Sequence, residues 1–143
     1  MENNSQAPRW FSVCAVLALV WNLLGLLAFI SHLMLTPEII AQFPPEQQPL
    51  YQNIPVWVTA AFALAVIGGC LGCVLLIMRN SLAKIVLILS LLGVIVQNIY
   101  SFFIIDTIAV AGPSSAVMPI LVIIIAMALI LMANKGQQNH WLN

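Results

Sequence analysis

The stretch NIPVWVTAAFALAVIGGCLGCVLLIMRN, residues 53–80, decides the fold. Between Asn53 and Arg79 it carries no charged side chain, yet it is rich in glycine, alanine and cysteine. It is long enough to cross a bilayer, whose core of about 30 Å needs roughly 20 apolar helical residues. Inside lipid, helices associate by close contact, which small side chains permit. The stretch therefore predicts a membrane-spanning helix that offers a packing surface to another helix.

Small residues recur on one face of this helix at four-residue steps. They are Ala61, Ala65, Gly69 and Cys73, with the pair Gly68 and Gly72 beside them. We expect this face to pack against the first helix of the same chain or against the same helix of a second copy. The sequence leaves both partners open.

Two other runs carry positions of the same kind. Gly93 is the small position expected to pack in the third run. In the first run a stripe recurs at alternating steps of four and three, the period of a left-handed helix pair. Its members are Cys14, Ala18, Trp21, Gly25, Ala28 and His32.

The composition extends the membrane prediction to the whole chain. Of its 143 residues 63% are hydrophobic and only 6% are charged, whereas a soluble domain is about 25% charged. Four continuous apolar runs, residues 10–35, 55–78, 82–105 and 115–134, are each long enough to span a bilayer. Continuous runs predict helices, because a membrane β-barrel would show alternation. We therefore expect residues 1–143 to form one all-α transmembrane domain, an up-down-up-down, left-handed four-helix bundle.

The charges predict an orientation. All four basic residues fall on one side of the four-span arrangement, and three of the four acids fall on the other. The basic residues are Arg9, Arg79, Lys84 and Lys135, and the three acids are Glu38, Glu46 and Asp106. Because positive charge prefers the cytoplasmic side, we expect both termini in the cytoplasm and the chain in a plasma (inner) membrane.

The longest connector, residues 36–54, lies on the outer side in this arrangement. Thr36 can cap a helix with Pro37 at its first position, and the apolar Ile39, Ile40 and Phe43 predict a short helix on the membrane surface. Such a loop can be a lid over a site or a plain bridge between two helices. The bridge is favoured because most connectors are bridges.

Polar side chains lie at depth in two of the runs. Trp21 and Asn22 sit near the middle of residues 10–35, and Gln97 and Asn98 sit near the middle of residues 82–105. A buried amide without a partner is costly, so these groups are expected to point inward. One interpretation is hydrogen bonding between helices, which is favoured. The other is a neutral pocket for an uncharged solute, walled by Trp21 and Tyr100 and joined by His32 from the outer end.

Several function classes are disfavoured. No acid or base lies deep in any run, as a proton-driven carrier usually requires. Cys70 and Cys73 lack the further ligands that a metal needs. No nucleophile stands near a usable base and no basic patch appears, so we expect neither an enzyme, nor a bound metal or cofactor, nor a nucleic-acid partner.

The chain resembles a family of small four-helix bacterial inner-membrane proteins, often described as hypothetical or loosely as sugar transporters. The segments that carry the resemblance are VWNLLGLLAF, the TPE to LYQNIPVWVTAAFALAVIGGCLGC region, VQNIYSFF and GPSSAVMPI. Within them the pattern is Trp21–Asn22, Pro55 to Ala63, Gly68 to Gly72, and Gln97 to Tyr100. The resemblance implies solute transport but no mechanism.

From these patterns we expect a lipid-embedded protein that packs through small-residue faces and binds or transports a small uncharged solute such as a sugar. Four helices leave little room for a pathway, so transport predicts a homodimer. The alternative is a non-transporting accessory or scaffold subunit that associates with another membrane protein. A polar cavity open to one side would favour the first, and a closed dry bundle the second.

Overall fold

The chain folds as a bundle of four long helices. The computed structural model describes residues 7–104 and 106–142, and those residues contain no β-strand. The long helices are α1 (Arg9–Leu33), α3 (Val56–Ile77), α4 (Leu82–Ile99) and α6 (Val117–Gln138). All four, with α4 counted to Ile104, are long and apolar enough to cross a membrane. The predicted all-α four-helix bundle is confirmed.

Short elements join the long helices. α2 (Pro37–Ile40) and the 3₁₀ turn η1 (Gln48–Leu50) form the loop between α1 and α3. α4 continues into one π-helical stretch, η2 (Tyr100–Ile104), followed by α5 (Thr107–Ala111) and the 3₁₀ turn η3 (Pro113–Ala116). α2 begins as expected, because the Thr36 side chain accepts a hydrogen bond from the Ile39 N–H at 3.3 Å.

The predicted helix bounds lie within two residues of the observed ones, except at the end of α6. That helix was expected to end at residue 134 but continues to Gln138. The Gln137 side chain donates to the Ser81 carbonyl at 3.0 Å, which ties the added turn to the α3–α4 connection. The helix then ends in a Schellman turn, with His140 at φ 57° and the Trp141 N–H bonded to the Gly136 carbonyl at 2.7 Å.

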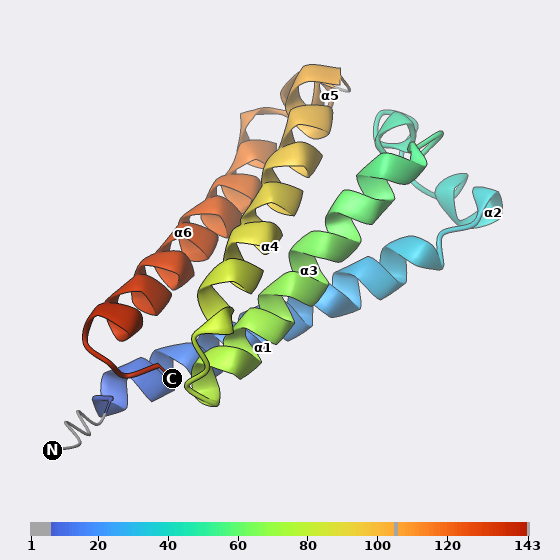
Figure 1. Ribbon diagram of the computed structural model, residues 1–143. Coiled ribbons are helices and arrows are strands. Elements are labelled where there is room, and N and C mark those ends of the chain that lie inside the picture. Colours follow the sequence, from blue (N-terminus) through green and yellow to red (C-terminus); the bar gives the residue numbers. More distant parts are fainter. Residues whose placement is uncertain (1–6, 105, 143) are drawn as a thin grey trace, which may run out of the picture.

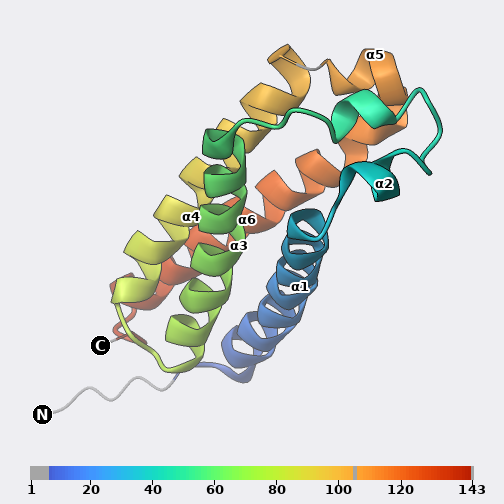
Figure 2. The same cartoon turned by 90° about the vertical axis from the view of Figure 1, so that its right-hand side faces the viewer.

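Successive long helices run in opposite directions, and both termini lie at the same end of the bundle (Figure 1). α3 lies between α4 and α1 and packs extensively against both, while α6 packs mainly against α4. α1 and α6 contact each other little, and Figure 1 shows that they diverge away from the end that holds the termini, while Figure 2 shows α3 between α4 and α1. We call the end with the termini the terminal end and the opposite one the loop end.

The small-residue face of α3 lies inside the chain. Gly68, Gly69 and Gly72 are all buried. A Cβ added at Gly68 would lie 3.1 Å from Ser90 Cβ, and one at Gly72 would lie 2.6 Å from Leu87 Cγ, so both glycines face α4. One added at Gly69 would collide with Asn22 of α1. The face is therefore occupied by two helices of the same chain, and α4 is a partner that the sequence did not single out.

The packing face of α1 differs from the predicted stripe. Cys14 and Ala28 are exposed, although Ala28 borders a cavity described below. The buried residues of α1 are Phe11, Ala15, Ala18 and Phe29. The prediction was wrong at Cys14 because the neighbouring Ala15, with Phe11, occupies the face of α1 that joins the buried cluster with Ala133 of α6. There Phe11 is 1% exposed and its ring lies 5.5 Å from that of Trp141.

Candidate functional site

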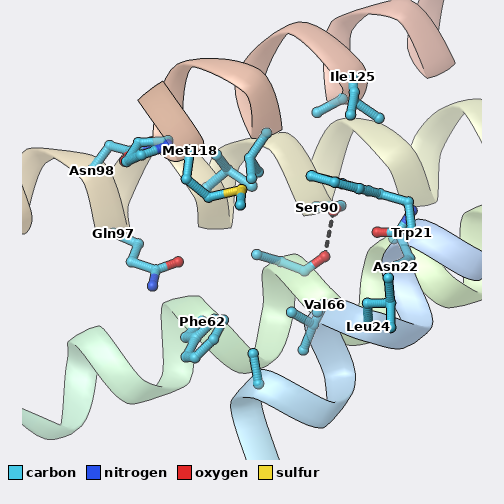
Figure 3. Close-up of a pocket in the computed structure, with 18 of the residues that line it drawn as sticks. Trp21, Asn22, Leu24, Phe62, Val66, Ser90, Gln97, Asn98, Met118 and Ile125 are labelled. Atoms are coloured by element: carbon cyan, nitrogen blue, oxygen red, sulfur yellow. Dashed lines mark hydrogen bonds between the residues drawn. The ribbon is translucent and has the colours of Figure 1, made fainter. Parts of the chain in front are cut away.

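A cavity of about 440 Å³ lies between the four long helices, and we call it the inner cavity. α1 contributes Trp21 and Asn22, α4 contributes Gln97 and Asn98, and α6 contributes Met118 (Figure 3). Its volume falls in the range of about 300–1,000 Å³ typical of ligand sites. The four polar or aromatic residues predicted at depth are therefore brought to one cavity.

The amides in this cavity differ in their bonding. Asn22 Nδ2 donates to the Ala18 carbonyl at 2.8 Å and to Cys73 Sγ at 3.5 Å. In residues 7–104 and 106–142, the side-chain amides of Gln97 and Asn98 have no hydrogen-bond partner, and both are half-buried. The expected bond between helices is thus present for Asn22 and absent for Gln97 and Asn98.

Ser90 supplies a side-chain hydrogen bond between α4 and α3. Its hydroxyl donates to the Ala65 carbonyl at 2.6 Å, and the side chain is 5% exposed (Figure 3). Ser90 borders the inner cavity, but its donor is already used. Among the described residues, the hydrogen-bonding side chains of the inner cavity that have no partner are therefore Gln97, Asn98, Trp21 and Ser101.

A second cavity of about 500 Å³, the outer cavity, lies at the loop end. His32 and Tyr100 border this cavity and are absent from the lining of the inner one. The His32 ring lies edge-on to Phe62 at 5.7 Å, and the Tyr100 ring lies edge-on to Trp57 at 5.6 Å. The single pocket predicted from six residues is thus divided between two cavities.

The α1–α3 loop covers the outer cavity. Its apolar side chains Phe43, Leu50, Tyr51 and Ile54 all border that cavity. The rings of Phe43 and Tyr51 contact edge-on at 5.1 Å, and Gln48 Nε2 donates to the Phe43 carbonyl at 3.0 Å. The loop is therefore folded onto the helices it connects and forms one wall of a cavity, which is more than a bridge requires.

The two cavities adjoin. Both are bordered by Ala28 of α1, Phe62 of α3, and Gln97 and Ser101 of the α4 segment. These four residues form a boundary layer, and Gln97 is its only amide. A molecule that occupied both cavities would pass this side chain.

The sequence did not point to Phe62 or Met118 as cavity residues. Both are apolar side chains on apolar helices, so nothing in their spacing sets them apart. The π-helical stretch Tyr100–Ile104 was also missed, although it places Tyr100 and Ser101 at the cavity walls. Thr107 Oγ1 donates to the Ser101 carbonyl at 2.6 Å and so satisfies a backbone group in that irregular turn.

Neither cavity is charged: among the described residues that border them there is no Asp, Glu, Lys or Arg. Asp106, the acid nearest to the bundle, is exposed and caps α5 by accepting from the Ala109 N–H at 3.4 Å. In the described part of the chain no three His, Cys, Asp or Glu side chains gather as a metal site would need. Cys70 and Cys73 are free thiols on α3.

Comparison with known proteins leaves the family open. No protein-family model, no curated protein and no solved structure matches the chain. The fold and the two cavities therefore define a class only, that of helical-bundle proteins with four helices suited to a membrane.

Proposed function

We propose that the chain is a multi-pass inner-membrane protein that binds a small uncharged solute between its helices and passes it across the bilayer. The observation that carries the proposal is the pair of unpaired amides, Gln97 and Asn98, on the wall of an uncharged cavity at membrane depth. A hydrogen bond that replaces bonds to water contributes about 0.5–1.5 kcal/mol net. A hydroxylated solute, such as a sugar, would supply that bond.

The charge pattern supports the orientation of the proposal. Arg9, Arg79, Lys84 and Lys135 all lie at the terminal end, while Glu38, Glu46 and Asp106 lie at the loop end. Under the positive-inside tendency the terminal end is cytoplasmic. The outer cavity then faces the exterior, and the covering loop stands at the entrance.

We do not propose a homodimer through the small-residue face of α3. Gly68, Gly69 and Gly72 are already covered by α4 and α1, so a second copy would have to use another surface. The exposed apolar faces of α1 and α6 are available to lipid or to another membrane protein. This availability is what favours the alternative, an accessory subunit of a larger complex, but that role leaves the unpaired amides unexplained.

The test is uptake of radiolabelled glucose and glycerol into proteoliposomes compared with protein-free liposomes. Gln97→Leu should lower uptake at least about fivefold, because each lost hydrogen bond is worth about 1 kcal/mol. Gln52→Leu, an exposed residue of the outer loop, is the matched control and should leave uptake unchanged. Uptake no faster than in empty liposomes, with Gln97→Leu more stable than the parent, would support the accessory role instead.

A further inference from the structure

The inner and outer cavities differ in the chemistry of the side chains that border them. The outer cavity has apolar walls too, but it is also bordered by His32, Tyr51 and Tyr100, and by Ser31 and Thr107, whose hydroxyls donate to the Leu27 and Ser101 carbonyls. Below the boundary layer the inner cavity is bordered mainly by hydrocarbon, from Trp21, Val66, Val94, Val122, Ile125 and Leu129. The outer cavity is therefore the more polar of two adjoining cavities, and the inner one is the more apolar.

The polar groups of the inner cavity do not change this gradient. The side chains of Asn22 and Ser90 already donate hydrogen bonds to the Ala18 and Ala65 carbonyls. Gln97 and Asn98 lie at the end of the inner cavity nearest the outer one, since Gln97 also borders the outer cavity. Apolar cavity walls favour apolar molecules, whereas a fully hydroxylated solute placed against the hydrocarbon part of this lining would lose its hydrogen bonds to water.

From this gradient we infer that the two cavities together bind an uncharged amphiphile. Its hydroxylated head lies in the outer cavity within reach of Gln97, and its apolar chain lies in the inner cavity. The head is uncharged because no Asp, Glu, Lys or Arg is found among the described residues that border either cavity. This inference rests on the proposed function and names the substrate class of that site.

The divergence of α1 and α6 suits such a ligand. Trp21 of α1 and Met118 of α6 border the inner cavity from opposite sides, and these helices separate toward the loop end (Figures 1 and 3). The same head-and-chain chemistry is found in membrane lipids and in water-soluble amphiphiles.

The experiment measures saturable binding to the full chain in nanodiscs, with empty nanodiscs subtracted. The probes are glucose, hexyl glucoside, octyl glucoside and monooctanoylglycerol, each below its micelle concentration. A buried methylene is worth about 0.8 kcal/mol, so each added pair should tighten binding roughly tenfold. Competition between octyl glucoside and a monoacylglycerol placed in the bilayer would support a lipid source, and its absence a soluble one.

Two substitutions on α6 separate cavity binding from bulk partitioning. Ala126→Phe fills the inner cavity and should weaken octyl glucoside binding at least tenfold, toward the affinity that the parent has for glucose. Ala128→Phe places the same ring on the exposed face of that helix and should change nothing. Val122→Phe is the second cavity-filling variant if Ala126→Phe does not fold.

The outcomes are distinct. Equal affinity for glucose and octyl glucoside in the parent would overturn the amphiphile inference while the proposed solute binding stands. If no probe with an alkyl chain bound saturably while glucose was still taken up, the amphiphile inference would also be overturned. Chain-length dependence that Ala126→Phe removes and Ala128→Phe preserves would support it.

Discussion

Gly93 lies where α4 passes directly over the backbone of α3. A Cβ at this position would lie 2.7 Å from the Ala61 carbonyl oxygen and 2.9 Å from the Ala65 nitrogen. Both are backbone atoms, so no flexible side chain can move aside. Gly25 is different, because an added Cβ there would meet only Val66 Cγ1 at 3.4 Å, an ordinary contact.

Gly93→Ala should therefore destabilise the bundle by about 2 kcal/mol, because overpacking of a tight contact costs 1–3 kcal/mol. Gly25→Ala should be neutral or slightly stabilising, since alanine is the better helix former. Unfolding by sodium dodecyl sulfate in mixed micelles, followed by circular dichroism, measures both. Equal stability of the two variants would show that α3 and α4 are not this close.

The hydrogen bond between Ser90 and the Ala65 carbonyl contributes less to stability than the close contact at Gly93. Ser90→Ala removes the 2.6 Å bond to the Ala65 carbonyl but leaves that carbonyl within its own helix. Bonds of this kind in membranes average about 0.6 kcal/mol, so the variant should lose less than half as much stability as Gly93→Ala. The same unfolding assay measures it. A loss larger than that of Gly93→Ala would mean that polar bonding, not backbone contact, holds α3 to α4.

Individual residues show what could be predicted from the sequence and what could not. The glycines at positions 68, 69 and 72 predicted a close contact between helices, because nothing else explains glycine in such a helix. They could not name the neighbour, since α1 and α4 both offer small residues at helical spacing. Gln97 and Asn98 indicated a polar site by their depth alone, but whether they bond a neighbouring helix or face a cavity depends on how the helices diverge.

At the scale of elements, the C-terminal return closes the terminal end of the bundle. After α6 the chain reverses at His140, and Leu142, 8% exposed, packs with Phe11 and Gly136. Lys135 Nζ lies 5.3 Å from the centre of the Trp10 ring in the same region. This return was not predicted, because hydropathy ends at residue 134 while the contacts that fold the last residues back come from α1.

Leu142→Ala should lower the free energy of unfolding by about 2 kcal/mol, the lower range for a leucine truncated in a packed site. Leu131→Ala, on the exposed face of α6 at 66% exposure, is the matched control and should have little effect in detergent. Thermal unfolding of the purified protein compares the two. If the control were destabilised as much as Leu142→Ala, the return would contribute no specific packing.

At the scale of the whole molecule, the bundle is closed at one end and hollow at the other. The buried cluster that includes Phe11, Leu76, Leu87, Leu129 and Ala133 lies toward the terminal end. The two cavities occupy the part of the bundle in which α1 and α6 separate. Helix number and length were predictable from hydropathy, but this asymmetry follows from crossing angles that hydropathy does not encode.

The same asymmetry appears in the charges, and it leads to a prediction about orientation. Arg9, Arg79, Lys84 and Lys135 lie at the closed end, where Lys84 Nζ donates to Asn134 Oδ1 at 3.0 Å. A lysine near the end of a membrane helix keeps its charge at the interface. Because cytoplasmic loops carry the excess of Lys and Arg, the closed end should face the cytoplasm and the hollow end the exterior.

Cysteines added one at a time to the parent chain test this orientation in intact cells with a membrane-impermeant maleimide. Gln47→Cys, in the outer loop, should be labelled, whereas Asn80→Cys, in the α3–α4 connection, should be labelled only after the cells are opened. The parent chain, which has three native cysteines, gives the background. Labelling of Asn80→Cys but not Gln47→Cys in intact cells would invert the topology. The cavities would then open toward the cytoplasm, and any solute they bind would have to come from there.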